Sequence, residues 1–234
     1  MRNNALNAWV AVPSHARPHH VAPMTKLIGE ATWYVREEEI DDYLNAGAAH
    51  VVRGGTLVQN RNAALRDSRV AGLPCIQLDD DLKRIRNAAG QDISFFFAAS
   101  LMLNRLRSSA YRLAGVAPTD NAYFSRREIT NFGFIIASFM VELPDSMLWF
   151  DPDLKLKEDY DHTVAHLKTY GGVVRCDDIL ATFNHYTAPG GCKAYRTEEI
   201  EKESCAVLLQ RHRGWLRPHG KRPHELSLVR PGRA

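Results

Sequence analysis

A short apolar run that stops on three consecutive carboxylates constrains this chain more than any other feature. Residues 75–78 read Cys-Ile-Gln-Leu and are followed at once by Asp79, Asp80 and Asp81. Neighbouring like charges repel one another, and a carboxylate leaves water only at a cost unless it gains a partner. Open α/β sheets bind their ligands beyond the carboxyl ends of the strands. The pattern predicts either a solvated acidic turn or a strand end that holds a divalent cation through oxygen ligands.

Strand-like and helix-like segments alternate along the chain, which is typical of an α/β fold. The expected strands are 8–12, 31–35, 50–52, 75–79, 132–141 and 173–183, the last interrupted by Asp177 and Asp178. The expected helices are 37–46, 57–70, 93–113, 156–170 and 198–215. The sequence contains neither a GxGxxG fingerprint nor a GxxxxGK[ST] loop, which disfavours a dinucleotide-binding fold and a Walker-type nucleotidase.

Length and composition indicate one globular domain. The chain has 234 residues, of which 45% are hydrophobic and 24% charged, enough for one sizeable core. Its four cysteines form no CxxC pair, which argues against a zinc ribbon or a dense disulfide framework. The most apolar stretch, residues 93–103, is too short to cross a bilayer, and the amino terminus lacks the apolar core of a secretory signal. We therefore expect a cytoplasmic protein, in the host cell if it is viral, with no membrane association and no obligate protein partner.

The carboxyl-terminal end of the chain is basic and rich in proline. The net charge of the whole chain is only +3, but residues 211–234 carry seven Lys or Arg side chains against a single acid. We expect residues 1–216 to form the domain and residues 217–234 to form a tail of little regular structure. Such a segment either follows the phosphates of a nucleic acid or only keeps the protein soluble, and the sequence leaves both alternatives open.

A second group of acids crowds the start of the helix expected at 156–170, namely Glu158, Asp159 and Asp161. Free amides and the helix dipole stabilise carboxylates at this end, so capping explains some of them. Successive residues diverge by about 100° around a helix axis, so these acids cannot all face one site. A carboxylate aimed at a cleft beside a metal-bound leaving group suits a general base. We predict that Asp159 is this base, with Asp161 as the competing position.

Three histidines are candidate metal ligands because of their spacing or their position in the chain. His185 follows the last expected strand and precedes Gly190 and Gly191, in a segment suited to closing over a substrate. A single histidine at a strand end is more often structural, but its order after both acidic groups favours a metal ligand. His162 and His166 stand four residues apart, a spacing that can hold zinc. Because the glutamate of HExxH is missing, we interpret these two as one face of a surface or core helix.

The order of these parts resembles that of the GT-A glycosyltransferases, whose hallmarks are a DxD metal motif, an xED motif with the base, and a carboxy-terminal histidine on the metal. Longer phrases are similar to the TET/JBP-associated glycosyltransferases, a group linked to sugar addition on hydroxymethylated pyrimidines in phage DNA and in some eukaryotic lineages. These phrases are residues 13–18, 59–65, 78–82, 156–161, 171–175, 190–191 and 195–196. The resemblance covers residues 9–215 and implies an α/β fold: a single GT-A-like domain with a nucleotide-binding half-sheet and a mixed central sheet flanked by helices.

The resemblance also implies residue roles. Mn²⁺ or Mg²⁺ would be held by Asp81, Asp79 and His185, although the run of three acids leaves the register of the motif open. The nucleotide sugar, expected to be UDP-glucose or a related UDP-sugar, would contact Ser14, Arg17, Arg61, Asp79 and Asp80. The catalytic acids would be Asp159, Glu158 and Asp161, and a base at the xED position implies inversion. The DNA would contact Tyr186, Tyr195, Arg196, Arg217, Lys221 and Arg222. Either Arg17 or Arg61 equally suits a salt bridge with the acid cluster.

Other functions remain open on the sequence. The same donor chemistry could serve a protein, lipid or saccharide acceptor. A non-catalytic nucleic-acid-binding domain would keep the basic tail without the chemistry. A phosphoryl-transfer nuclease would use the acids as a two-metal site.

Overall fold

The computed structural model describes residues 2–3, 6–123, 125, 129–184 and 196–232, and within them a mixed sheet of nine strands forms the centre of the protein. These strands are β1 (Arg2–Asn3), β2 (Ala8–Pro13), β3 (Thr32–Val35), β4 (His50–Arg53), β5 (Cys75–Leu78), β7 (Leu113–Val116), β8 (Ile129–Thr130), β9 (Phe139–Glu142) and β10 (Val174–Cys176). The order across the sheet is β4-β3-β2-β5-β9-β7-β10-β8, and β1 pairs with β2 outside this order. The predicted α/β class with a mixed central sheet is confirmed.

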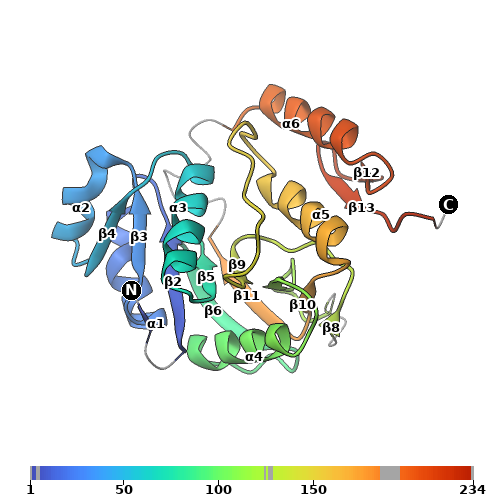
Figure 1. Ribbon diagram of the computed structural model, residues 1–234. Helices are drawn as coiled ribbons and strands as arrows, with labels where there is room; N and C mark the ends of the chain where they lie inside the picture. The colour runs from blue at the N-terminus through green and yellow to red at the C-terminus, as the bar shows by residue number, and fades with distance from the viewer. Residues whose placement is uncertain (1, 4–5, 124, 126–128, 185–195, 233–234) are drawn as a thin grey trace.

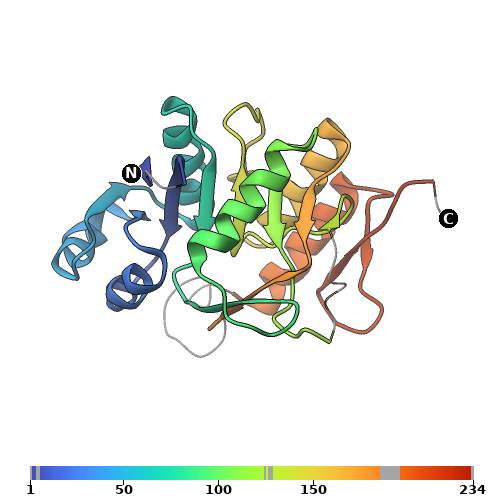
Figure 2. The same cartoon turned by 90° about the horizontal axis from the view of Figure 1, so that it is seen from below.

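Helices cover both faces of this sheet (Figures 1 and 2). They are α1 (Val21–Ile28), α2 (Ile40–Asn45), α3 (Leu57–Val70), α4 (Phe95–Arg107), α5 (Glu158–Tyr170) and α6 (Glu198–Arg211). Buried side chains of α1 and α4 pack with Val10 and Val12 of β2, whereas those of α3 and α5 share a second cluster with Ala11. Successive residues of a strand point to opposite faces. The central strands are therefore buried on both sides, as parallel strands usually are.

The first half of the sheet is parallel. Strand β2 pairs in parallel with both β3 and β5, and β3 pairs in parallel with β4. The chain therefore leaves β2 toward one edge of the sheet and returns to add β5 on the other side of β2. Strand β9 then inserts antiparallel between β5 and β7.

Local signals in the sequence explain where several helices begin and end. Helix α3 begins with a capping box in which Thr56 and Gln59 satisfy each other's backbone amides, a common helix start. Ser94 caps α4 by accepting a hydrogen bond from the Phe97 amide at 3.1 Å. Helix α5 ends at Gly171, which adopts a left-handed conformation with φ of 78°, where glycine lacks the steric penalty of other residues.

The carboxyl-terminal segment is more ordered than expected. Strands β12 (Leu216–Pro218) and β13 (Leu226–Leu228) form an antiparallel hairpin. Leu216 and Leu226 are buried with Leu208 of α6 and Val164 of α5, so this layer covers α5 on its outer side (Figure 1). The prediction of little regular structure over residues 217–234 was wrong for the strand residues 217–218 and 226–228, because Leu216 and Leu226 complete a small core that α5 and α6 leave open.

The helix expected over 198–215 ends at Arg211. Two further expected elements differ in their bounds near the central sheet. The helix expected over 93–113 ends at Arg107, and β7 begins at Leu113, because all four β7 residues are buried between β9 and β10. The strand expected over 132–141 is regular only in β9, from Phe139 to Glu142. The interruption at Asp177 and Asp178 is confirmed, since they separate β10 from β11 (Ile179–Phe183). In each case strand pairing, rather than local propensity, sets the bounds.

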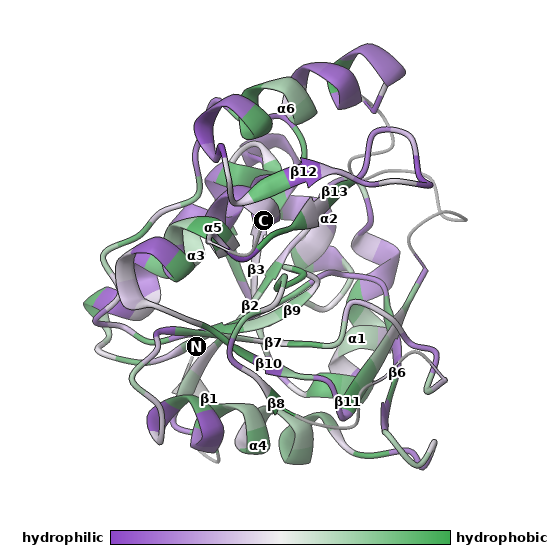
Figure 3. Ribbon diagram, turned by 90° about the vertical axis from the view of Figure 1, so that its right-hand side faces the viewer, coloured by the Kyte–Doolittle hydropathy of each residue, from purple (hydrophilic) through white to green (hydrophobic). Residues whose placement is uncertain are grey.

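The sequence did not predict α1, β6 (Leu82–Asn87) or the hairpin strands. Strand β6 pairs antiparallel with β11 in a separate two-stranded sheet. Its sequence, Leu-Lys-Arg-Ile-Arg-Asn, is largely charged, and Figure 3 shows it as mainly hydrophilic beside the hydrophobic central strands. Such a strand lacks an apolar run that would identify it. Among the described residues, no helix is both long and apolar enough to cross a membrane.

Candidate active site

The three consecutive acids lie at the point where the strand order reverses. Strand β5 ends at Leu78, directly before Asp79, and its neighbour β2 ends at Pro13, directly before Ser14. Because β2 continues to β3 on one side while β5 lies on the other, the carboxyl ends of these two strands flank a crevice. Ligands of open α/β sheets bind at this position. The acid triplet thus lies where the fold itself favours a ligand.

Asp80 is the most heavily paired of the three acids. Its carboxylate accepts hydrogen bonds from Arg17 Nη1 at 2.8 Å and from the Ser14 hydroxyl, and His20 Nδ1 lies 3.6 Å from it. Burial alone would raise the pKa of Asp80, but His20 and Arg17 lower it. Asp80 is therefore an anion that links the loop after β2 to the end of β5. Arg17 forms the salt bridge with the acid cluster that the sequence offered as an alternative to nucleotide binding.

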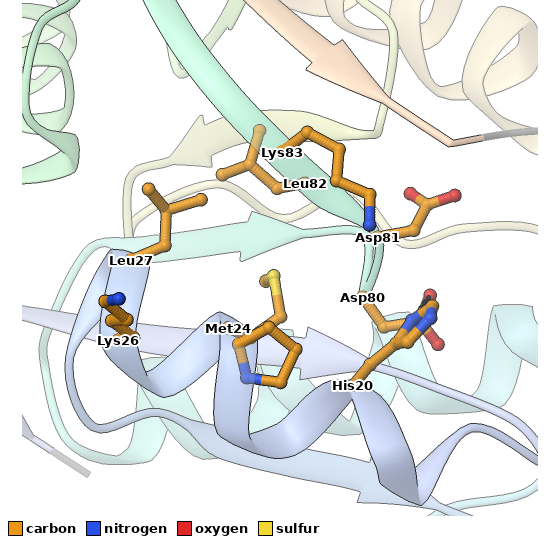
Figure 4. A pocket seen from close by; sticks show the side chains of 9 residues that line it. His20, Met24, Lys26, Leu27, Asp80, Asp81, Leu82 and Lys83 are labelled. Atoms are coloured by element: carbon orange, nitrogen blue, oxygen red, sulfur yellow. Dashed lines mark ion pairs between the residues drawn. The ribbon is translucent and has the colours of Figure 1, made fainter.

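Asp81 borders a pocket together with Asp80. Arg17 Nη1 lies 3.9 Å from Asp81 Oδ2. Figure 4 shows the pocket between α1 and the start of β6, with a volume of about 310 Å³. Its lining comprises His20, Pro23, Met24, Lys26, Leu27, Asp80, Asp81, Leu82 and Lys83. Carboxylate oxygens are the ligands that Mg²⁺ and related hard cations prefer. The ammonium groups of Lys26 and Lys83 provide positive charge that can pair with phosphates.

Arg61 connects the acid triplet to the acids of α5. Its guanidinium donates to Asp79 Oδ1 at 3.0 Å and to Glu158 Oε1 at 3.2 Å, and also to the Ala137 carbonyl at 3.1 Å. The side chain is 3% exposed. Burial would lower the pKa of Arg61, but Asp79 and Glu158 raise it. Arg61 therefore also forms a salt bridge with the acid cluster, as the sequence allowed. The same side chain brings the two predicted acidic groups into one site.

Asp159 stands at the start of α5 beside this bridge. Burial and the neighbouring charge of Glu158 raise the pKa of Asp159 to about 7, although Arg61 opposes the shift. Lys157, which directly precedes α5, has a left-handed backbone with φ of 63°. Its buried ammonium lies 2.8 Å from Glu201 of α6. The outer layer thereby fixes the first turn of α5. Burial and the charge of Glu158 give Asp159 the proton affinity that a base needs near neutral pH.

Asp161 occupies a different environment from Asp159. Its carboxylate pairs with Arg211 Nη1 at 2.9 Å and with His212 Nε2 at 2.8 Å. Burial would raise the pKa of Asp161, but these two partners lower it. Both partners lie at the end of α6, so Asp161 binds that helix to α5. This geometry favours Asp159 over Asp161 as the base.

Several predicted residues cannot be placed in this site. His185, Tyr186 and Tyr195 lie outside the described residues. Asn184, which directly precedes His185, donates its backbone amide to the Asp81 carbonyl at 3.2 Å, so the chain reaches the acid triplet immediately before that histidine. Arg196 is exposed and pairs with Glu201 at 2.6 Å.

The predicted DNA-binding cations of the hairpin are exposed. Arg217 lies on β12, and Lys221 and Arg222 lie in the turn between β12 and β13. They belong to the outer layer with α6 rather than to the central sheet (Figure 1).

Among the side chains of the pocket that sequence reasoning missed are His20 and Lys83. His20 lies three residues beyond Arg17, and Lys83 lies two residues beyond Asp81. Their proximity to motif residues was a usable signal. The short helix η1 (Pro18–His20) and strand β6 decide their positions, however, and neither element was predicted.

Arg61 provides a prediction about stability. The substitution Arg61→Ala should lower the free energy of unfolding by about 3–5 kcal/mol, because it leaves buried carboxylates without their cation. The matched control is Arg66→Ala on the same helix, whose side chain is 58% exposed and should change stability by less than about 0.5 kcal/mol. Urea unfolding of the three proteins measures the difference. Equal stabilities of the two variants would contradict the proposed bridge.

The site thus combines three kinds of group at one edge of the sheet. The strand end supplies carboxylates, α1 and β6 supply cationic side chains, and α5 supplies an acid with a raised pKa. Comparison of the chain with protein-family models and with curated proteins gave no match.

Proposed function

We propose that the protein is a metal-dependent glycosyltransferase of the GT-A type, which moves a hexose from a UDP-sugar to a hydroxymethyl-pyrimidine in DNA. One observation carries the proposal: Arg61 joins Asp79 of the strand end to Glu158 beside Asp159. Arg61 therefore links a group suited to a metal and diphosphate with the helix start that carries a group suited to an acceptor hydroxyl. The resemblance of the sequence motifs to the TET/JBP-associated group supplies the identity of donor and acceptor.

The carboxylates after β5 suit a cation that would bind the diphosphate of the sugar donor. Asp79 and Asp81 offer oxygen ligands for Mn²⁺ or Mg²⁺, and the backbone amide of Asn184 contacts the Asp81 carbonyl. A cation bound there would neutralise the negative charge that grows on the departing diphosphate. Asp80 remains engaged with Arg17, so its role is to hold the loop after β2 in place. Lys83 is available at the rim of the same pocket for a phosphate oxygen.

The acceptor half follows from the pKa of Asp159. A base with a pKa of about 7 takes a proton effectively at neutral pH. Asp159 removes the proton of the acceptor hydroxyl while that oxygen bonds to the anomeric carbon of the sugar. The bond from this carbon to the diphosphate breaks on the opposite face, so the anomeric configuration inverts. The nucleoside diphosphate leaves with the electron pair of that bond.

The DNA acceptor imposes an additional requirement. A pyrimidine stacked in a duplex is out of reach of such a crevice and must be flipped out, at a cost of a few kcal/mol. Contacts to the phosphate backbone can offset this cost. The exposed cations Arg217, Lys221 and Arg222 are our candidates for these contacts.

The experiment that tests the function is direct. The protein is incubated with Mn²⁺, a panel of nucleotide sugars, and DNA with or without hydroxymethylcytosine, and the digested nucleosides are analysed by mass spectrometry. We expect a hexose mass added to the modified nucleoside only when metal, donor and modified DNA are all present. Donor turnover on saccharide or protein acceptors but not on DNA would reject the acceptor assignment. Nicking of plasmid with Mg²⁺ alone would indicate the nuclease alternative.

The hairpin cations provide a graded prediction. Truncation is unsuitable because Leu226 is buried, so we choose the triple variant Arg217→Gln, Lys221→Gln and Arg222→Gln. Each lost phosphate contact should reduce the slope of log affinity against log salt by about 0.9 for duplex DNA. Fluorescence anisotropy over a salt series measures this slope. The control is Lys202→Gln, an exposed cation on α6 paired with Glu198. A triple variant with the unaltered slope would exclude the hairpin from DNA binding.

A further inference from the structure

A cluster of three buried ligand-type side chains lies on the sheet side of α5, apart from the acid triplet. Glu142 is the last residue of β9, and His162 and His166 lie one turn apart on α5. The three side chains are at most 1% exposed. Glu142 pairs in register with Cys75, the first residue of β5, whereas the acid triplet follows the last residue of β5. The cluster therefore lies near the opposite end of that strand.

The three facing atoms converge as metal ligands do. Glu142 Oε2 lies 2.7 Å from His162 Nε2 and 3.7 Å from His166 Nε2, and the two nitrogens are 3.2 Å apart. A tetrahedral ion with bonds of about 2.0–2.1 Å separates its ligand atoms by about 3.3 Å. The observed separations lie on both sides of this value. An ion at the centre therefore needs only small side-chain adjustments.

Hydrogen bonding alone leaves polar atoms of this cluster unpaired or facing like groups. Within the described part of the chain, neither His162 Nδ1 nor His166 Nδ1 has a hydrogen-bond partner. If each ring carries its proton on Nε2, two N–H groups face each other across 3.2 Å. If His162 Nε2 carries none, its lone pair faces the Glu142 carboxylate at 2.7 Å. If only His162 Nε2 carries a proton, it donates to Glu142, and His166 carries its proton on Nδ1, which has no partner among the described residues. A cation bound to the three facing atoms would remove the repulsions between them.

We propose that Glu142, His162 and His166 form a binding site for a transition-metal ion, with Zn²⁺ as the expected occupant. Two imidazole nitrogens and one carboxylate oxygen are a donor set that Zn²⁺ accepts readily. Arg69 binds the other oxygen of Glu142 at 2.8 Å and so presents Oε2 to the two rings, as outer partners of metal sites do. A water molecule would complete the four-coordinate site.

The position of this site suggests what the ion does. His162 and His166 follow Asp159 by three and seven residues, which places them about 4.5 and 10.5 Å farther along the helix axis. An ion bonded to both rings and to β9 would fasten α5 to the sheet behind the first turn that carries Asp159. We therefore assign the ion to positioning α5, separately from the hard cation at Asp79 and Asp81.

Cobalt binding tests the proposal without any measurement of transfer. Metal-free full-length protein is titrated with Co²⁺, because four-coordinate Co²⁺ absorbs visible light far more strongly than the six-coordinate ion expected at an all-oxygen site. The titration is repeated in Asp81→Asn, which removes a charge from the oxygen site. We expect an intense band that saturates at one equivalent in both proteins and is displaced by Zn²⁺.

Variants provide the second measurement. His166→Leu should remove the intense band and weaken Co²⁺ binding by more than about 100-fold, since loss of even an outer partner costs 10- to 100-fold. The control His212→Leu removes another buried histidine that contacts α5 and should keep the band. A weak six-coordinate spectrum in the unaltered protein overturns the proposal, whether or not the variants fold. An intense band that survives His166→Leu overturns it equally.

Discussion

The substitution Asp159→Asn should reduce sugar transfer by about 10²- to 10⁴-fold, the usual contribution of a general base. Donor, metal and DNA binding should persist, because Asp159 is assigned neither to the cation nor to the phosphates. Single-turnover kinetics with saturating donor and DNA, alongside binding titrations, separate chemistry from affinity. The competing substitution Asp161→Asn should leave the chemical step nearly unchanged and lower the free energy of unfolding by about 1–3 kcal/mol, through loss of charged hydrogen bonds to α6. The opposite result would move the base to Asp161.

The raised pKa adds two consequences for the same residue. The transfer rate of the unaltered protein should rise with pH through about 7, because only the ionised Asp159 accepts a proton. The folded protein binds this proton more tightly than the unfolded chain, whose aspartate has the ordinary lower pKa. Stability contributed by the protonated group is therefore lost as the pH rises toward 7. Asp159→Asn should consequently have a higher free energy of unfolding than the unaltered protein at pH 8. At pH 5 the two free energies of unfolding should lie closer together. A lower stability of the variant at pH 8 would contradict burial as the cause of the shift.

The substitution Asp81→Asn should abolish the dependence of UDP binding on Mn²⁺. An amide keeps the shape of the carboxylate but provides no charge against the cation, and hard cations depend strongly on anionic oxygen ligands. Isothermal titration of UDP with and without Mn²⁺ measures the effect, and circular dichroism verifies the fold. The control is Asp92→Asn, a carboxylate with 74% exposure that lies outside the pocket. An unchanged Mn²⁺ effect in Asp81→Asn would mean that the metal motif has another register.

The parallel substitution Asp80→Asn distinguishes the two neighbouring acids. Asp80 binds Arg17 and Ser14, so its loss should destabilise the loop after β2 and weaken UDP binding both with and without Mn²⁺. Asp81→Asn should instead weaken only the metal-dependent part. The difference between these two patterns identifies which carboxylate faces the cation.

The sequence predicted the α/β class because strands buried on both faces require continuous apolar runs, and such runs are visible along the chain. It also predicted that β5 ends on acids, since Asp79 follows the apolar residues directly. The choice of Asp159 over Asp161 had a local basis as well, because the two positions point in different directions from one helix. These inferences depend on residues close together in the chain.

The contacts between these segments required the tertiary structure. Arg61 is 97 residues from Glu158 in sequence, and nothing local indicates that one guanidinium binds both acidic groups. The histidine pair on α5 was interpreted as an ordinary helix face because its carboxylate partner, Glu142, comes from β9 rather than from the helix. The hairpin after α6 was likewise missed, since Leu216 and Leu226 are buried only against α5 and α6.

Local sequence thus indicated helices α2 to α6, strands β2 to β5 and the acids that follow or begin them, because backbone preference and side-chain periodicity act over a few residues. Tertiary structure alone decided the protonation of Asp159, the partner of each arginine and the convergence of Glu142 with His162 and His166. These properties depend on burial and on charges brought together by the order of strands in the sheet. That order is fixed by the packing of the whole chain.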